Sequence, residues 1–256
     1  MRWADAECVD LNDFARNATP VLWRAVSIVV VLLRPGELVV VGDSGGSVLE
    51  PGDARPTFVP YDKVRVTTTG AVVAAVGKGT VRSAGGAEDL LERAQVLADG
   101  AHGSVRVVAA GEIADYMDSI APAVREQVGC GEFTVDPDGR PVLTQILVAR
   151  ASEAGIAAHV AQLPAHGLCY STPVNLPGAV LGVGAYTIEA AQVVERAQQL
   201  SDTQAAVEEV VAYIDVLGRS RPLEVSRTVR IVVVRADQAP VVTQRTLSVQ
   251  ADVPRH

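Results

Sequence analysis

Two unbroken apolar runs joined by a Pro-Gly turn restrict the possible folds most strongly. The first run is Ser27–Leu33 and the second is Glu37–Val41, with Pro35 and Gly36 between them. Strands that are apolar at every position are covered on both faces, whereas strands covered on one face alternate. The sequence therefore predicts a buried β-hairpin that begins with a hydroxyl residue and is followed by a carboxylate, Asp43.

The core of this protein must be built almost entirely from aliphatic side chains. Hydrophobic residues make up 48% of the 256 residues, but aromatic residues make up only 4%. Valine favours strands because of its β-branch, whereas alanine and leucine favour helices. This composition predicts a mixed α and β protein, and the length allows one large domain or two small ones.

Charge and apolar run length exclude several classes of partner. The net charge of −8 leaves no basic surplus for a phosphate backbone, so we expect no nucleic-acid partner. The longest apolar runs are about eight residues, which is too short to cross a bilayer. Acids at Asp5, Glu7 and Asp10 and the lack of an apolar segment there argue against a signal peptide. We therefore expect a soluble cytoplasmic protein without a membrane partner.

The three cysteines, Cys8, Cys130 and Cys169, show neither metal-ligand spacing nor C-x-x-C spacing. An odd number of cysteines without such spacing is typical of free thiols in a reducing compartment. A thiol enzyme that pairs Cys130 or Cys169 with His159 or His166 has no support in the spacing.

Two glycine motifs match known catalytic strings, but the context is wrong for both. Gly42-Asp-Ser-Gly-Gly46 copies the sequence around the nucleophile of chymotrypsin-like proteases. Those enzymes need a His and an Asp upstream, whereas all four histidines lie downstream of this motif. A lipase elbow is excluded because no helix is predicted after Ser44. Gly77-Lys-Gly79-Thr80 lacks the full spacing of a phosphate loop.

Strand patterns recur along the rest of the chain. A second hairpin is predicted from Lys63–Thr69, a turn at Gly70 and the apolar run Ala71–Val76. Residues 44–60 are rich in Gly and Pro and are expected to be irregular. Further strands are predicted at Ser104–Val108, Glu132–Val135, Pro141–Val148, Gly155–Val160 and Val225–Val234.

Apolar residues at helical spacing predict four helices, at residues 90–97, 113–124, 190–200 and 207–217. Pro122 is expected to kink or break the second helix. Ser201-x-x-Gln204 is a capping-box pattern that opens the fourth helix, and Gly218 is expected to end it.

The predicted order of strands, two helices, strands, two helices and a strand indicates an α+β fold. Strands joined by tight turns pair antiparallel, and sheets that are apolar on both faces need cover on both. We therefore predict a four-layer αββα sandwich, in which two antiparallel sheets stack face to face between helix pairs. It forms one domain at residues 27–240, after an N-terminal extension or propeptide at 1–26. Residues 241–256 are expected to be a loose tail or a short final strand.

The spacing of four residues matches a specific family. Asp43 follows Ser27 by sixteen residues, and Gly77 follows Lys63 by fourteen. With this spacing and element order, residues 26–235 resemble the proteasome β-subunit family, including its bacterial ring-protease relatives. Those proteins are N-terminal-nucleophile hydrolases, and the resemblance implies the same αββα fold.

The resemblance implies a role for each of these residues. Ser27 would be the nucleophile once residues 1–26 are removed, and its freed α-amine would be the base. Lys63 would lower the pKa of the Ser27 hydroxyl, and Asp43 would keep Lys63 charged and oriented. The backbone N–H of Gly77 would donate to the oxyanion. Ala75 would face the pocket for the substrate side chain.

Later positions also fit the family, and others depart from it. Gly182-x-Gly184 opens the third helix, and Asp215 near the end of the fourth matches a catalytic-site acid. The residue before the nucleophile is Val26 instead of Gly. Two supporting serines of the family are replaced by Val183 and Gly218.

The resemblance implies amide-bond hydrolysis, most readily of peptides, in a homo-oligomeric ring without a metal or organic cofactor. An ATPase or unfoldase partner is possible in such a family, but the sequence identifies none. The departures keep two alternatives open: a noncatalytic ring or scaffold subunit, and an amidase that acts on a small metabolite.

Overall fold

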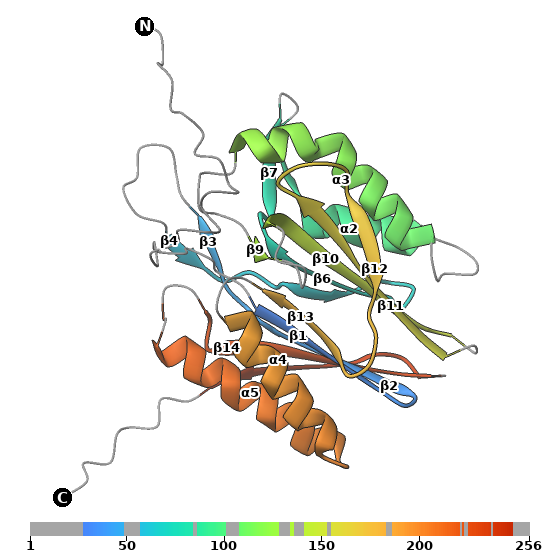
Figure 1. The fold of residues 1–256 in the computed structure, drawn as a ribbon, viewed down its shortest axis with the longest axis vertical. Helices are drawn as coiled ribbons and strands as arrows, with labels where there is room; N and C mark the ends of the chain where they lie inside the picture. Colours follow the sequence, from blue (N-terminus) through green and yellow to red (C-terminus); the bar gives the residue numbers. More distant parts are fainter. Residues whose placement is uncertain are drawn as a thin grey trace, which may run out of the picture.

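Two large antiparallel sheets and four helices make up most of the described part of the chain (Figure 1). The predicted α+β class is confirmed at this level. The structure is a computed structural model, and it describes residues 28–48, 57–83, 86–100, 108–127, 134–135, 141–152, 155–182, 186–220, 222, 225–236 and 238–247.

The first predicted hairpin is the centre of a five-stranded sheet. β1 (Ile28–Arg34) and β2 (Glu37–Asp43) pair antiparallel, and Gly36 in the turn between them has a φ of 73°. This left-handed conformation favours glycine, which explains the Pro-Gly turn. The strand order is β13-β1-β2-β14-β15, and the added strands are β13 (Gly178–Gly182), β14 (Thr228–Arg235) and β15 (Val241–Thr246).

The second sheet contains the second predicted hairpin. Its strand order is β12-β11-β10-β6-β5, and β9 also pairs with β10. Every pairing in it is antiparallel. The strands are β5 (Val64–Val66), β6 (Val72–Gly77), β9 (Thr134–Val135), β10 (Pro141–Ser152), β11 (Gly155–Pro164) and β12 (Tyr170–Pro173).

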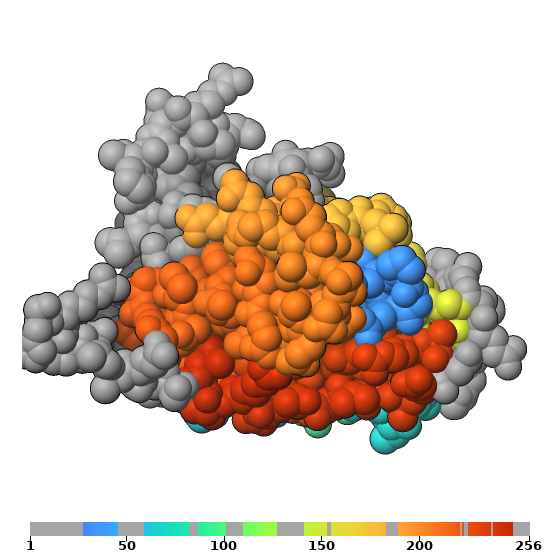
Figure 2. Space-filling view, turned by 90° about the horizontal axis from the view of Figure 1, so that it is seen from below, coloured from blue at the N-terminus to red at the C-terminus, as the bar shows by residue number. Residues whose placement is uncertain are grey.

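One pair of helices packs against each sheet (Figure 1). α2 (Leu90–Gly100) and α3 (Val108–Gln127) pack on the second sheet, and α4 (Tyr186–Gln199) and α5 (Thr203–Ser220) pack on the first. Figure 2 shows α4 and α5 in orange, with the red strands of the chain's C-terminal part beside them. None of the helices described is long and apolar enough to cross a membrane.

The two sheets also pack on each other. Val29, Val31 and Val40 of the first sheet form one buried cluster with Val72 and Leu147 of the second. β1 and β2 therefore have buried side chains on both faces, which is why β1 is apolar from Ile28 to Leu33 and β2 from Leu38 to Val41.

The ends of the helices differ from the sequence prediction. α5 begins at Thr203, and the carboxylate of Asp202 accepts the backbone N–H of Ala205 at 2.9 Å. Asp202 is therefore the N-cap, and the prediction from Ser201 is wrong. α5 also continues past Gly218 to Ser220, and α3 continues through Pro122 to Gln127.

Short strands lie where irregular structure was predicted. Within residues 44–60, β3 (Gly46–Val48) pairs with β4 (Thr57–Val59). Further along the chain, β7 (Thr80–Ser83) pairs with β8 (Gly86–Asp89), where the sequence predicted no strand. Of the strand predicted at Ser104–Val108, residues 104–107 lie outside the described ranges and Val108 begins α3. β15 is the final strand that was one of two predicted alternatives, so the sheet extends beyond residue 240.

Gly42 brings the two sheets close together at one end. A Cβ atom on Gly42 would lie 2.6 Å from Cγ2 of Val64 and 3.2 Å from Cγ2 of Val29. Gly42 directly precedes Asp43, and Val64 directly follows Lys63. The missing side chain thus lets the strands that carry this acid and this base approach each other.

We predict that Gly42→Ala destabilises the protein by about 1–3 kcal/mol, because Val64 must move to admit the methyl group. Gly111→Ala in α3 is the control, since a Cβ there has no neighbour within 4 Å. It should stabilise the protein by about 0.5–1 kcal/mol through helix propensity. Urea unfolding measures both changes. Equal stabilisation by the two substitutions would show that the close approach at Gly42 does not matter.

Candidate functional site

Asp43 is a fully buried carboxylate at the end of β2 (0% exposed). Its Oδ1 accepts the backbone N–H of Ile28 at 3.0 Å, and its Oδ2 accepts the backbone N–H of Ser226 at 3.1 Å. A buried carboxylate is tolerated only when donors replace the water it has lost. The segments on either side of β2 supply two of these donors.

Lys63 supplies the third donor. Its ammonium nitrogen lies 2.7 Å from both oxygens of Asp43, and the side chain of Lys63 is only 2% exposed. A pair buried to this extent is held by direct charge attraction with little screening by solvent. The structure thus brings together Asp43 and Lys63, which the sequence had placed twenty residues apart.

Burial changes the proton affinity of Lys63. Desolvation lowers the pKa of its ammonium below the ordinary value of 10.5, while the charge and hydrogen bonds of Asp43 oppose this shift. A buried lysine with a lowered pKa exchanges a proton more readily than a surface lysine. This property suits a group that assists proton transfer.

The residues beside Lys63 fix its segment to the rest of the fold. Asp62 forms an ion pair with Arg230 of β14 at 2.5 Å, and the Tyr61 hydroxyl donates to Asp89 at 2.9 Å. The carbonyl of Lys63 accepts the N–H of Ala75 at 3.0 Å. Lys63 is therefore held by its backbone and its neighbours as well as by Asp43.

Gly77 ends β6, two residues beyond the residue that is bonded to Lys63, and it is exposed. Its φ is +89°, and a Cβ atom there would lie 2.2 Å from the carbonyl oxygen of Leu143. Only glycine fits both constraints. The backbone at Gly77 is thus open to solvent at the strand end nearest Lys63.

Ala75 lies beside Lys63, but little of it is open to a ligand. It is 4% exposed and belongs to the cluster that packs against α2 and α3, with Leu90 and Met117 among its members. The small side chain packs within this cluster.

Asp215 forms ion pairs with two arginines. Its Oδ1 lies 3.0 Å from Nη2 of Arg227, and its Oδ2 forms a second ion pair with Arg219 on the same helix. Burial raises the pKa of Asp215, but the hydrogen bonds and charges of the two arginines outweigh this and lower the pKa overall. Asp215 is therefore held as an anion by arginines.

Part of the family pattern lies outside the described residues. This part consists of Val26, Ser27, Val183 and Gly184. The first described residue is Ile28, whose N–H is bonded to Asp43.

The other motifs gain no support as sites. Ser44 is 7% exposed, and its hydroxyl has no hydrogen-bond partner in the described structure. Cys169 is a free thiol whose pKa is raised to about 12 by burial and by Asp118. Among the described residues, no group of three or more His, Cys, Asp or Glu side chains could hold a metal ion.

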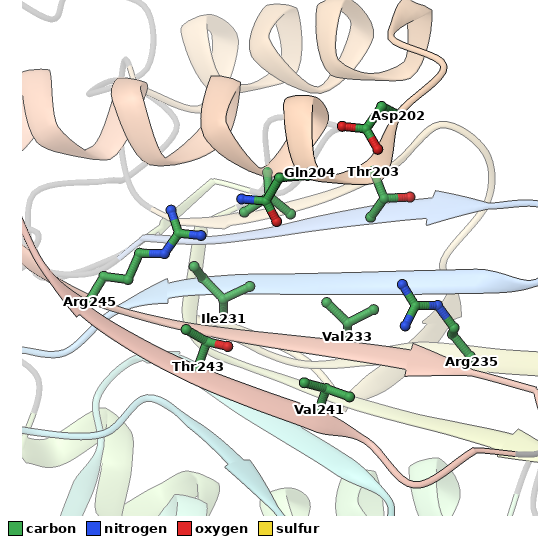
Figure 3. A pocket seen from close by; sticks show the side chains of 10 residues that line it. Asp202, Thr203, Gln204, Ile231, Val233, Arg235, Val241, Thr243 and Arg245 are labelled. Carbon is green, nitrogen blue, oxygen red and sulfur yellow. The ribbon is translucent and has the colours of Figure 1, made fainter.

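A hollow of about 280 Å³ lies elsewhere, between the start of α5 and the strands β14 and β15 (Figure 3). Apolar side chains such as Ile231 and Val241 line its floor, and Arg235 and Arg245 stand at its ends. Both arginines are already paired, with Glu37 and Glu208 respectively. The hollow contains none of the predicted site residues.

Sequence reasoning missed three members of the site. They are the backbone N–H of Ile28, the backbone N–H of Ser226, and Arg230, which anchors the segment of Lys63. Backbone donors leave no residue-type signal in a sequence. The donor Ile28 could have been predicted from the antiparallel register of the first hairpin, because that register places Ile28 opposite Asp43.

A scan against protein-family models gives no match to this chain, and a search of curated proteins gives none either.

We predict a strong energetic coupling between Asp43 and Lys63. Asp43→Asn and Lys63→Met should each cost about 3–5 kcal/mol of stability, because each leaves a buried partner uncompensated. The double variant should cost less than the sum by more than about 1 kcal/mol. The control is the pair of Arg196 and Glu209, 2.7 Å apart but 56% and 34% exposed, whose coupling should stay below about 1 kcal/mol. Additive costs at Asp43 and Lys63 would contradict the prediction.

We predict a pH dependence of stability that originates at Lys63. Between the lowered pKa of folded Lys63 and 10.5, the unfolded chain holds a proton that the folded chain has released. The Lys63 ammonium therefore raises the free energy of unfolding as pH rises between these two values, by up to about 1.4 kcal/mol per pH unit. The difference in unfolding free energy between wild type and Lys63→Met should therefore grow toward pH 10.5. Urea unfolding at several pH values measures it, and a constant difference would refute the prediction.

Proposed function

We propose that this chain is a proteasome-like N-terminal-nucleophile hydrolase with a four-layer αββα fold, in which Ser27 cleaves amide bonds of peptides. The packing of one helix pair on each sheet, and of the sheets on each other, is the arrangement that this fold requires. The spacing of Ser27, Asp43, Lys63 and Gly77 agrees with the same family.

One observation carries the proposal. The buried carboxylate of Asp43 binds both the ammonium of Lys63 and the backbone N–H of Ile28. Ile28 is covalently joined to Ser27, and neighbouring Cα atoms are about 3.8 Å apart. A buried acid therefore holds a cation close to the peptide group that follows the proposed nucleophile.

The first reaction would remove residues 1–26. The Ser27 oxygen attacks the carbonyl carbon of Val26, and the hydroxyl proton passes to the departing peptide nitrogen. The C–N bond between Val26 and Ser27 breaks, leaving the upstream segment as an ester on the serine oxygen and a free α-amine. Water then attacks the ester, which releases the segment as a carboxylic acid and restores the hydroxyl.

The same groups would then cleave a substrate. The α-amine, with an ordinary pKa of about 7.7–8.0, takes the hydroxyl proton as the Ser27 oxygen attacks the amide carbon. The Gly77 N–H donates to the oxyanion; removal of one oxyanion donor costs about 2.7–4 kcal/mol where a side chain supplies it. The amine returns the proton to the leaving nitrogen, and water hydrolyses the acyl ester.

By the same resemblance, we propose that the protein assembles into a homo-oligomeric ring.

A noncatalytic ring subunit is the second candidate, and two observations favour it. Asp215 is engaged by Arg219 and Arg227, and Ala75 is only 4% exposed. In that case the Asp43–Lys63 pair would stabilise the fold and perform no chemistry.

We predict that the purified protein lacks residues 1–26, so that its intact mass corresponds to a chain beginning with Ser27. Ser27→Ala should retain the full chain, because no oxygen is present to attack Val26. Ser44→Ala is the matched control and should be cut like wild type. An electrophile selective for N-terminal Ser or Thr should label the cut protein, and Lys63→Met should slow labelling by about 100-fold or more.

Mass spectrometry separates the two candidates. An uncut wild-type chain that is also not labelled by the electrophile would exclude the hydrolase and favour the noncatalytic subunit. Continued cutting of Ser27→Ala would show that another protease removes the segment.

A further inference from the structure

The segment that leads into β14 forms one side of the Asp43 site. The Ser226 N–H donates to Oδ2 of Asp43 at 3.1 Å, and the Ser226 hydroxyl accepts the N–H of Thr228 at 3.0 Å. The carbonyl of Thr228 in turn accepts the N–H of Ser44 at 2.7 Å. The position of the Ser226 peptide therefore decides whether Oδ2 of Asp43 keeps this backbone donor.

Arg227 directly follows Ser226 and is held through both its side chain and its main chain. Its side-chain Nε and Nη2 lie 3.1 Å and 3.0 Å from Oδ1 of Asp215 on α5. Its carbonyl accepts the N–H of Leu247 at 2.8 Å. Because two nitrogen atoms of one planar guanidinium meet the same carboxylate oxygen, the orientation of Arg227 is well defined.

Gly218 provides the space that Arg227 occupies. A Cβ atom on Gly218 would lie 2.7 Å from Cγ of Arg227 and 3.4 Å from the carbonyl oxygen of Val225. Gly218 lies inside α5, where glycine costs helix stability relative to alanine. Its presence is explained by the close approach of the 225–227 segment to this face of the helix.

We propose that Asp215, Arg227 and Gly218 form a positioning unit that holds the Ser226 N–H against Asp43 and so keeps Lys63 in place for the chemistry at Ser27. Asp215 then acts at a distance, through Arg227 and the peptide of Ser226, and does not itself touch the reacting atoms. The catalytic part of this inference rests on the proposed function, whereas the coupling to Asp43 does not.

A double-mutant cycle tests the coupling without any enzymatic readout. Arg227→Gln and Asp43→Asn are combined, and the unfolding equilibrium constant of each variant is measured in urea. Their effects should be non-additive by about fivefold or more, because both act on the same Ser226–Asp43 contact. The matched control combines Asp43→Asn with Arg219→Gln. Arg219 also pairs with Asp215 but lies on the exposed side, and its effect should add to within about twofold.

Gly218→Ala gives an independent test of the same unit. Helix propensity alone would make this substitution stabilising. If the methyl group displaces Arg227, the variant should instead be destabilised and should lose the coupling to Asp43→Asn, as Arg227→Gln does. If Arg227→Gln does not fold, Arg227→Lys takes its place in the cycle. The lysine keeps a positive charge opposite Asp215, so this variant should retain part of the coupling to Asp43.

The rate at which the serine-selective electrophile labels Ser27 tests the catalytic part. Arg227→Gln and Gly218→Ala should slow labelling by about tenfold, and Arg219→Gln should leave it unchanged. If wild type is never labelled, the proposed function fails, but the cycle still decides the positioning role. Additive effects of Arg227→Gln and Asp43→Asn, or equal coupling from Arg219→Gln, would overturn the inference.

Discussion

A carboxylate that is removed from water needs hydrogen-bond donors from the protein itself. The buried carboxylate of Asp43 has this requirement, and the arrangement of the surrounding segments depends on it. Three segments meet it: the start of β1 through Ile28, the residue before β5 through Lys63, and the segment that leads into β14 through Ser226. Two of these segments belong to one sheet and the third belongs to the other. Loss of any of these donors would leave the buried carboxylate incompletely compensated, so the contacts of Asp43 link the positions of the two sheets.

Small residues allow the backbones around this pair to come close. Gly42 admits Val64 between the sheets, Gly77 lies against the Leu143 carbonyl, and Gly218 admits Arg227 against α5. The core elsewhere is built from Val, Ala, Leu and Ile, with few aromatic rings to hold the layers apart. Dense packing of this kind leaves little room for adjustment, since interiors transmit a local change in volume to their neighbours. Of the three glycines, Gly42 lies next to the charged pair in sequence, and it lets the strand that ends in Asp43 approach the strand that follows Lys63.

The spacing of apolar residues and the turn residues were sufficient to predict the hairpins, the α+β class and the four helices. These features depend on patterns within short stretches of sequence. The prediction failed where no pattern of residue types identifies the deciding contact. Gly218 looked like a helix end, but it is glycine because Arg227 lies against it. The N-cap is Asp202 and not Ser201, since propensity ranks both residues alike and only the observed hydrogen bond to Ala205 separates them. Ser226 contributes a backbone N–H, which any residue except proline supplies, so no pattern could have identified it.

The two sequence spacings that pointed to the site, from Ser27 to Asp43 and from Lys63 to Gly77, are determined by the strand registers of the two hairpins. In the first hairpin Val29 pairs with Gly42, so Asp43 falls opposite Ile28 and sixteen residues after Ser27. In the second, Val64 pairs with Ala74, so Lys63 lies beside Ala75 and Gly77 follows two residues later. A spacing within one hairpin can therefore be read from sequence, because the turn length sets the register. Asp43 and Ser226 are 183 residues apart, with several elements between them. Their contact therefore could not be predicted from the residue spacing of a single hairpin. Sequence spacing locates the charged pair, and only the fold reveals what holds it in place.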